Sequence, residues 1–239
     1  MRVRLVAASV LAVATLTASA NADNHLSPEQ IAALKAHNEA IVAAEPKAAG
    51  VFEVQNDGSI RHIQSGMICP ASFPNVSFWH AEVFSDDNHK GEDVGCDYGR
   101  NDKNGTWVEK FTIFAVKSAP GTTLDSAFET YRGQVIQTFP NAVSIGVAIK
   151  LEDKGAGSSS ALPKCRSEAF SVDRDVGQTT EELIVSIQGG WDLEIRNSYF
   201  GKPNSIVVNK GEDDAAVKAV GDRIISAFAF VSVSPTLGK

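Results

Sequence analysis

The sequence predicts an α+β protein in which amphipathic helices cover an antiparallel β-sheet and an additional N-terminal helix precedes the sheet. Two observations predict this fold class. Short segments with one apolar face, separated by turn residues, recur over 51–116 and 143–208, which is typical of antiparallel strands. Two longer segments, 122–139 and 212–228, carry apolar residues at steps of three and four, which is typical of amphipathic helices.

The first residues of the chain predict a cleaved secretory signal peptide. Arg2 and Arg4 form a basic start, Leu5–Ala18 is apolar and uncharged, and Ala20-Asn21-Ala22 matches the small-residue pattern of a cleavage site. The apolar run is too short to anchor in a bilayer. The expected organisation is, in chain order, a signal peptide, an N-terminal helix and a single α+β domain, over residues 1–22, 23–50 and 51–239.

The N-terminal helix has a clear start and a clear end. Ser27 can cap the helix, Pro28 suits its first position, and Gln30 completes a capping box. Glu45-Pro46 ends it, because the residue before a proline is disfavoured in a helical conformation. Large apolar residues are few in this segment, so we expect the helix to pack lightly against the domain.

The first half of the domain predicts a meander of short strands. Asn56-Asp57-Gly58 is a hairpin signal, and Asn101–Gly105 is a turn before a long strand. The strands expected in this half are 51–54, 59–64, 76–84, 94–98 and 107–116.

The second half begins with a helix and continues with strands. Thr122 and Asp125 stand in capping-box spacing, and Pro140 ends the helix. The segment 155–160 is rich in Gly and Ser and is expected to be a flexible loop. The clearest hairpin of the chain turns at Gly189-Gly190. The strands expected here are 143–151, 166–172, 183–187, 191–199 and 206–208, before a terminal helix over 212–228.

Alternation in the last hairpin predicts which face of the sheet meets solvent. The side chains expected on the solvent face are Asp192, Glu194, Arg196 and Ser198. Asp192 and Glu194 could form a carboxylate pair for acid–base chemistry, but an ordinary charged outer face has the same spacing and is the interpretation we favour. The tryptophans are expected to be buried in the core, with a ligand groove as the alternative; they are Trp79, Trp107 and Trp191.

The charge balance disfavours nucleic acid as a partner. The chain has 22 basic and 29 acidic residues and a net charge of −7, with no cluster of Lys or Arg to bind phosphates. Cleavage of the signal peptide would remove two of the basic residues, Arg2 and Arg4, and would leave no apolar run long enough to span a membrane. Phosphate-binding loop motifs are missing, and we expect no cofactor.

The three cysteines are disulfide candidates, because export leads to an oxidising compartment. Cys69 and Cys96 are the better pair, since both lie beside predicted strands in the same half of the chain. Their bridge would stabilise the fold by roughly 3–4 kcal/mol through loop closure. Cys165 is left as a buried thiol, a partner in an intermolecular bridge, or a reactive thiol.

The order of elements resembles that of the PsbP/DcrB-like α/β/α sandwich proteins, over about Val51 to Phe230. The most recognisable part is Ile184–Tyr199 together with the closing helix. Ser65–Pro70 and Asp93–Tyr98 are similar to the paired cysteine segments of exported bacterial proteins. The resemblance implies an accessory or binding role outside the cytoplasm, and it implies no catalytic residues.

An acidic loop is the candidate cation site. Hard cations such as Ca²⁺ prefer oxygen ligands, and one loop offers five of them: Asp86, Asp87, Asn88, Glu92 and Asp93. The spacing is not that of an EF-hand, and a solvated acidic turn is the interpretation we favour over weak Ca²⁺ binding. His62 and His80 lie on neighbouring predicted strands close to Cys69, so a zinc site is a weaker hypothesis beside that of two partly exposed histidines.

These observations predict an exported accessory or ligand-binding protein of the bacterial envelope, periplasmic or secreted, that is not an enzyme. A periplasmic hydrolase is the alternative from the enzyme class, although the chain has no Gly-x-Ser-x-Gly motif. An envelope module that binds a protein partner is the third hypothesis. The expected partner is thus a small ligand or another envelope protein.

Overall fold

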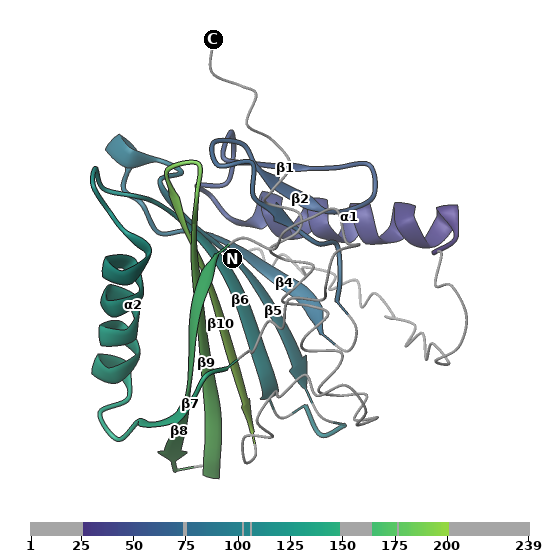
Figure 1. Ribbon diagram of the computed structural model, residues 1–239. Coiled ribbons are helices and arrows are strands. Elements are labelled where there is room, and N and C mark those ends of the chain that lie inside the picture. Colours follow the sequence, from purple (N-terminus) through teal and green to yellow (C-terminus); the bar gives the residue numbers. More distant parts are fainter. Residues whose placement is uncertain are drawn as a thin grey trace, which may run out of the picture.

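A computed structural model describes residues 26–200 except 74–75, 102, 106, 149–163 and 176. Within these residues the chain forms two antiparallel sheets and two α-helices (Figure 1). The predicted signal peptide over 1–22, the loop over 155–160 and the terminal segments over 206–228 lie outside the described residues.

The smaller sheet has three short strands in the order β1-β2-β3; they are β1 (Phe52–Val54), β2 (Ile60–His62) and β3 (Ile68–Cys69). The larger sheet has seven strands in the order β4-β5-β6-β10-β9-β8-β7, each antiparallel to its neighbours. Its strands are β4 (Ser77–Val83), β5 (Asp93–Asn101), β6 (Trp107–Lys117), β7 (Val143–Gly146), β8 (Cys165–Arg174), β9 (Gly177–Gln188) and β10 (Trp191–Phe200).

The helices are α1 (Pro28–Ala44) and α2 (Leu124–Thr138), and a 3₁₀ turn, η1 (Asp87–His89), precedes β5. The predicted capping box of Ser27 and Gln30 is confirmed for α1, and Glu45 is its C-cap. The cap of α2 is one residue later than predicted, at Thr123, whose hydroxyl accepts a hydrogen bond from the backbone of Ser126.

The predicted α+β sandwich is wrong for the described residues, which form a mostly β fold. The two helices have 17 and 15 residues, whereas β6 and β9 alone have 11 and 12. α2 packs on β8 and β9, and the opposite face of the large sheet is covered by the small sheet. Apolar periodicity located the helices, but it does not measure how much of a sheet each helix covers.

The two faces of the large sheet have different partners. On the first, which we call the small-sheet face, Leu193 and Ile195 pack with the buried side chains of the small sheet. On the second, the α2 face, Leu183 and Val185 pack against α2. Successive residues of a strand point to opposite faces, so Glu194, between Leu193 and Ile195, belongs to the α2 face.

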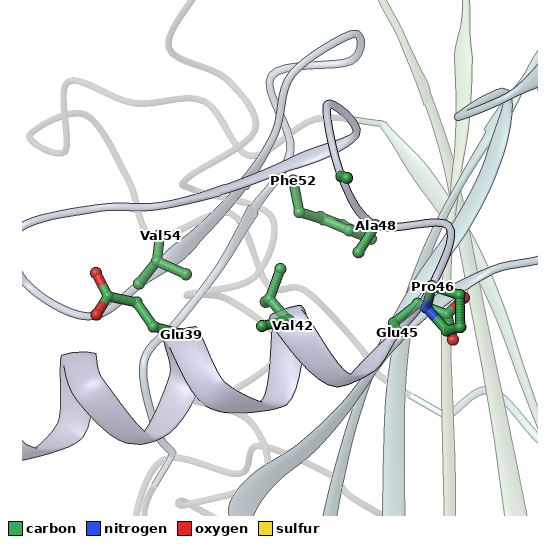
Figure 2. Close-up of a pocket in the computed structure, with 9 residues that line it drawn as sticks. Glu39, Val42, Glu45, Pro46, Ala48, Phe52 and Val54 are labelled. Carbon is green, nitrogen blue, oxygen red and sulfur yellow. The ribbon is translucent and has the colours of Figure 1, made fainter.

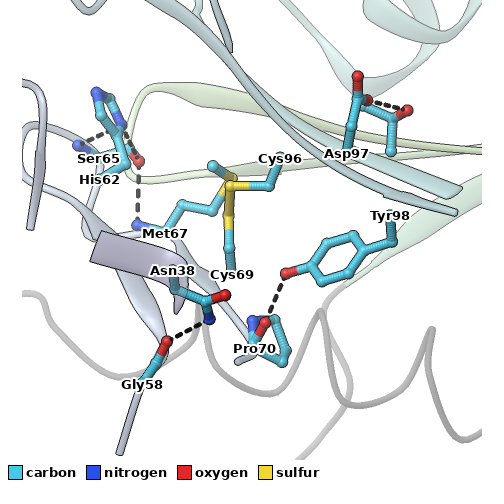
Figure 3. Close-up of a disulfide and its surroundings, with 11 residues drawn as sticks. Asn38, Gly58, His62, Ser65, Met67, Cys69, Pro70, Cys96, Asp97 and Tyr98 are labelled. Carbon is cyan, nitrogen blue, oxygen red and sulfur yellow. Dashed lines mark hydrogen bonds between the residues drawn. A yellow bond between two sulfur atoms is a disulfide. The ribbon is translucent and has the colours of Figure 1, made fainter. Parts of the chain in front are cut away.

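The predicted disulfide is present and joins the two sheets. Cys69 of β3 is bonded to Cys96 of β5, with Cα atoms 6.3 Å apart (Figure 3). Beside it, the Tyr98 hydroxyl donates a hydrogen bond to the Pro70 carbonyl at 2.7 Å, and the Asn38 amide donates one to the Gly58 carbonyl at 2.8 Å. The disulfide fits a protein from an oxidising compartment. Neither helix of the described chain has the length and apolar character needed to cross a membrane.

The last hairpin is confirmed. β9 and β10 pair from Gln188 opposite Trp191 to Thr179 opposite Phe200, and they turn at Gly189-Gly190, where both residues have positive φ, 57° and 83°. Such a turn favours glycine, which adopts positive φ without strain, and it matches the twist of the strands that it joins. The hairpin therefore places β10 between β9 and β6, at the centre of the large sheet.

Candidate functional site

The α2 face is covered at one end and open at the other. α2 lies beside β8 and β9, while β4, β5 and β6 extend beyond it (Figure 1). Antiparallel register places Asp93 in one row with Asp192, and Gly95 in the next row with Phe114 and Glu194. These rows lie at the boundary between the covered part and the open part.

A groove of about 230 Å³ lies at this boundary, and we call it the acidic groove. The side chains that define it come from β5, β6, β10, α2 and the residue after β4; they are Phe84, Asp93, Phe114, Tyr131, Glu194 and Arg196. Apolar walls with a few converging polar groups are typical of small-molecule sites. The volume is below that of pockets for drug-sized ligands, so the groove suits a small one.

Asp93 is the unpaired charge of the acidic groove. Its side chain is half-buried and takes part in no hydrogen bond or ion pair found in the described part of the chain. Burial raises the pKa of this carboxyl above its ordinary value. A carboxylate that loses water without gaining a partner is unfavourable for folding, which makes Asp93 the strongest candidate for a ligand contact.

Glu194 and Arg196 are the polar residues that β10 contributes to the acidic groove. Glu194 is only 2% exposed, so the predicted solvent face of β10 is wrong at this position. Burial raises the pKa of Glu194, the ion pair with Arg196 opposes this shift, and the negative charge of Asp93 adds to it. The guanidinium of Arg196 also donates a hydrogen bond to the Gln134 side chain at 2.7 Å and lies 5.5 Å from the centre of the Phe114 ring.

An aromatic pair closes the groove on the side of β4. The rings of Phe84 and Phe114 are tilted, with centroids 5.9 Å apart, and Phe84 is 46% exposed. Both rings lie over Gly95, where an added Cβ atom would come within 3.2 Å of each. A side chain at position 95 would therefore push against both rings, and glycine leaves them room to pack there.

Tyr131 fixes α2 to the polar side of the groove. Its hydroxyl donates a hydrogen bond to the Asp192 carboxylate at 3.2 Å, and the Ser118 hydroxyl donates a second one to the same group. Burial, and then the charge of Asp192, raise the pKa of Tyr131 well above its ordinary value. Asp192, predicted to face solvent, is buried by these contacts.

The candidate calcium ligands are placed in three different settings. The Asp86 carboxylate accepts hydrogen bonds from the backbone of Asn88 and His89, at 3.0 Å each, and so caps η1. Glu92 pairs with Lys117, and Asp93 faces the acidic groove. Asp87 begins η1 and is exposed. Calcium binding by this loop stays a prediction.

The hypothetical zinc ligands are separated. Cys69 is in the disulfide, His62 is buried in the small sheet, and His80 lies on β4 of the large sheet. Among the described residues, one set of three side chains could hold a metal ion, namely His80, Glu82 and Asp97. The sequence could not indicate this set, because Asp97 meets His80 only through the pairing of β4 with β5.

His62, which is buried, and Ser65, which is partly buried, form a pair of an imidazole and a hydroxyl like the base and nucleophile of a serine hydrolase. Nδ1 of His62 lies 2.7 Å from the Ser65 hydroxyl, and that hydroxyl accepts a hydrogen bond from the backbone of Met67 (Figure 3). Burial lowers the pKa of His62 to about 4. A general base works best when its pKa is near the operating pH, so this pair is better explained as part of the β2–β3 turn.

The remaining predicted residues are structural or exposed. Trp79 is 48% exposed, so its predicted place in the core is wrong, whereas Trp191 packs against the core. The side chain of Trp107 lies outside the described part. Cys165 is a half-buried free thiol whose pKa is raised by burial, which disfavours a reactive thiolate.

A second groove, of about 350 Å³, lies between α1 and β1. Val42 of α1 and Phe52 and Val54 of β1 line it, and the carboxylates of Glu39 and Glu45 lie at its rim (Figure 2). Apart from these two glutamates its lining is apolar, so it offers fewer kinds of polar group that could select a ligand than the acidic groove does. The acidic groove is therefore the better candidate site.

The sequence indicates this site only in part. It indicates Asp93 as a candidate calcium ligand and Glu194 as half of a candidate carboxylate pair. The contribution of Phe84, Phe114 and Tyr131 depends on strand register and on the position of α2.

No known protein-family model matches the chain, and no curated protein is significantly similar to it.

Proposed function

We propose that the protein is an exported binding protein, not an enzyme, whose acidic groove takes a small ligand with a cationic amine and an apolar part. The observation that carries this proposal is the unpaired, half-buried carboxylate of Asp93. An ammonium group placed against Asp93 would compensate the charge that burial makes unfavourable.

The aromatic pair suits the same ligand. The faces of Phe84 and Phe114 can attract a cation through their π systems, and their edges give apolar contact to its carbon chain. The net charge of −7 adds a long-range field that attracts cations and repels anions. An anionic ligand would meet the carboxylates of Asp93 and Glu194, with that of Asp192 on the same face of the sheet and Arg196 already paired.

The disulfide between Cys69 and Cys96 and the signal peptide predicted over 1–22 support export. The proposed location is the periplasm or the outside of the cell. The likeness to PsbP/DcrB-like accessory proteins remains part of this proposal for the role alone, since the sandwich fold that it implied is not the one found.

A second candidate function is that of an interaction module, and β7 is the observation that favours it. β7 is an edge strand of the large sheet, and its apolar side chains are exposed, with Val143 at 63% and Ile145 at 41%. An exposed apolar edge strand can pair with a strand of another protein. Replacing Val143 by Lys would block such pairing, and an unchanged set of partners after cross-linking in the envelope would contradict it.

Calorimetric titration tests the binding function with a defined probe. We expect the purified protein to bind 2-phenylethylamine and not the neutral 2-phenylethanol, because only the amine carries a charge for Asp93 at pH 7. Asp93→Asn should abolish the heat, whereas Asp87→Asn, an exposed carboxylate of the preceding 3₁₀ turn, should leave it unchanged. Equal binding of amine and alcohol, or undiminished binding by Asp93→Asn, would overturn the proposal.

A further inference from the structure

We propose that His80, Glu82 and Asp97 form a binding site for one divalent transition-metal ion, with Zn²⁺ as the best match. The site lies on the open part of the α2 face, at the β4 edge of the large sheet. It is independent of the acidic groove, and none of its three ligands lines that groove.

The register of β4 and β5 brings the three side chains together. His80 and Asp97 are direct partners across the two strands. Glu82 follows His80 by two residues and therefore projects from the same face. The pairing shifts between Phe78 and His80, and this bulge changes the phase of β4 so that His80 rather than Trp79 stands opposite Asp97.

The distances suit a metal ion after small side-chain rotations. One donor atom from each of His80, Glu82 and Asp97 lies within 4.8 Å of the others, and Nδ1 of His80 is 3.9 Å from the Glu82 carboxylate. Donors bonded to Zn²⁺ at about 2.0–2.2 Å in a tetrahedron are roughly 3.5 Å apart. The donor atoms, at most 4.8 Å apart, therefore need to approach one another by no more than about 1.3 Å.

Asp97 is held in place as a metal ligand would be. It is 4% exposed, and the Thr112 hydroxyl donates a hydrogen bond to one of its carboxylate oxygens at 2.6 Å. Its other oxygen lies 3.2 Å from the ammonium of Lys110. Hydrogen bonds of this kind orient metal-binding carboxylates and contribute to affinity. Lys110 is then the cation that a metal ion would displace.

The remaining surroundings supply access and charge. The side chains of His80 and Glu82 are 43% and 37% exposed, so an ion can enter from solvent. The carboxylate of Glu45, at the end of α1, lies 3.9 Å from Nε2 of His80 and adds negative charge. A donor set of one imidazole and two carboxylates fits Zn²⁺ better than Ca²⁺ or Mg²⁺, whose protein ligands are oxygens.

Titration of the untagged, metal-free protein with Zn²⁺ tests the site. We expect one equivalent to bind, with an affinity more than about tenfold weaker in His80→Ala and in Glu82→Gln. His89→Ala is the matched control, because His89 also lies beside a carboxylate, that of Asp86, but in an exposed turn outside the site. The affinity of the His89→Ala protein for Zn²⁺ should equal that of the parent protein.

Lys110→Met provides a test in the opposite direction, since removing the competing ammonium should strengthen Zn²⁺ binding. Co²⁺ bound at the site should give the visible absorption spectrum of a low-coordinate ion, and His80→Ala should lose it. Absence of a one-to-one equivalent, equal affinity of the His80→Ala and His89→Ala proteins, or Ca²⁺ binding as tight as that of Zn²⁺ would overturn the inference.

Discussion

The imidazole ring of His62 lies edge-on against the indole ring of Trp191, with ring centroids 5.3 Å apart. The contact joins β2 of the small sheet to β10 of the large one, and Phe52 packs on the same imidazole at 5.7 Å. His62 is fully buried, and Nε2 of its ring makes no hydrogen bond with any residue that the structure describes. The interface between the sheets therefore holds a histidine in its neutral form.

Acid should weaken this interface. Burial lowers the pKa of His62 to about 4, from 6.5 in the unfolded chain, so the folded state binds its proton less readily. The stability tied to the neutral ring is complete above pH 6.5 and is lost as the pH falls toward 4. The full loss is about 3 kcal/mol in the free energy of unfolding.

Urea unfolding of the parent protein and of His62→Gln at pH 7, 5.5 and 4.5 measures this loss of stability. The parent should lose more stability on acidification than His62→Gln, and the difference isolates His62 from carboxyls that titrate in the same range. His89→Gln, changed at an exposed histidine, should follow the parent. Parallel curves for the parent and His62→Gln would contradict the prediction.

Reduction of the disulfide should destabilise the protein by about 3–4 kcal/mol, because the bridge closes a loop of 27 residues in sequence separation. The double substitution of Cys69 and Cys96 by Ala should do the same without reductant. Cys165→Ser should change the denaturation midpoint little, since that thiol is half-buried and unbridged. Equal midpoints with and without dithiothreitol would show that the bridge is absent from the purified protein.

The sequence allowed prediction of the local features and failed on those that need distant pairing. The capping box at Ser27, the turn at Gly189-Gly190 and the partnership of Cys69 with Cys96 follow from short motifs or from the chemistry of the compartment. The burial of Asp192 and Glu194 could not be predicted from the sequence, because these residues alternate with apolar residues in the same way whether α2 or water covers their face of the sheet.

At the candidate sites, too, the sequence indicates individual residues but not the neighbours that strand pairing brings to them. Asp93 was singled out within an acidic loop, but its neighbours in the acidic groove come from β6, β10 and α2. The sequence suggests a zinc site that His80 shares with His62, whereas the register and the bulge of β4 place His80 opposite Asp97. A shift of one residue in that register would have turned His80 to the other face of the sheet.

Removing one hydroxyl should loosen α2. Tyr131→Phe loses the hydrogen bond to the buried Asp192 carboxylate, which keeps its bond from Ser118. We expect a loss of about 1–2 kcal/mol in the free energy of unfolding, and faster hydrogen exchange in the amides of α2. Ile136 is an exposed residue of the same helix, so Ile136→Ala should leave amide hydrogen exchange in the turn around Tyr131 nearly unchanged. Unaltered exchange in Tyr131→Phe would show that the hydroxyl does not hold the helix.

Asp93→Asn should make the protein more stable at pH 7 while abolishing amine binding. Burial raises the pKa of Asp93, so the folded state disfavours the ionised carboxylate, and this cost grows as the pH rises from the unfolded pKa through the folded one. The amide avoids that cost at pH 7, whereas at pH 3 the parent carboxyl is largely protonated and the advantage should nearly disappear. Urea unfolding at both pH values measures the difference.

A stability gain coupled to a loss of binding is typical of a residue kept for function at the expense of folding. Asp87→Asn supplies the reference for a carboxylate in solvent and should show neither effect. If Asp93→Asn instead destabilised the protein at pH 7, its carboxylate would be engaged in a favourable contact, and the acidic groove would lose the unpaired charge on which amine binding depends.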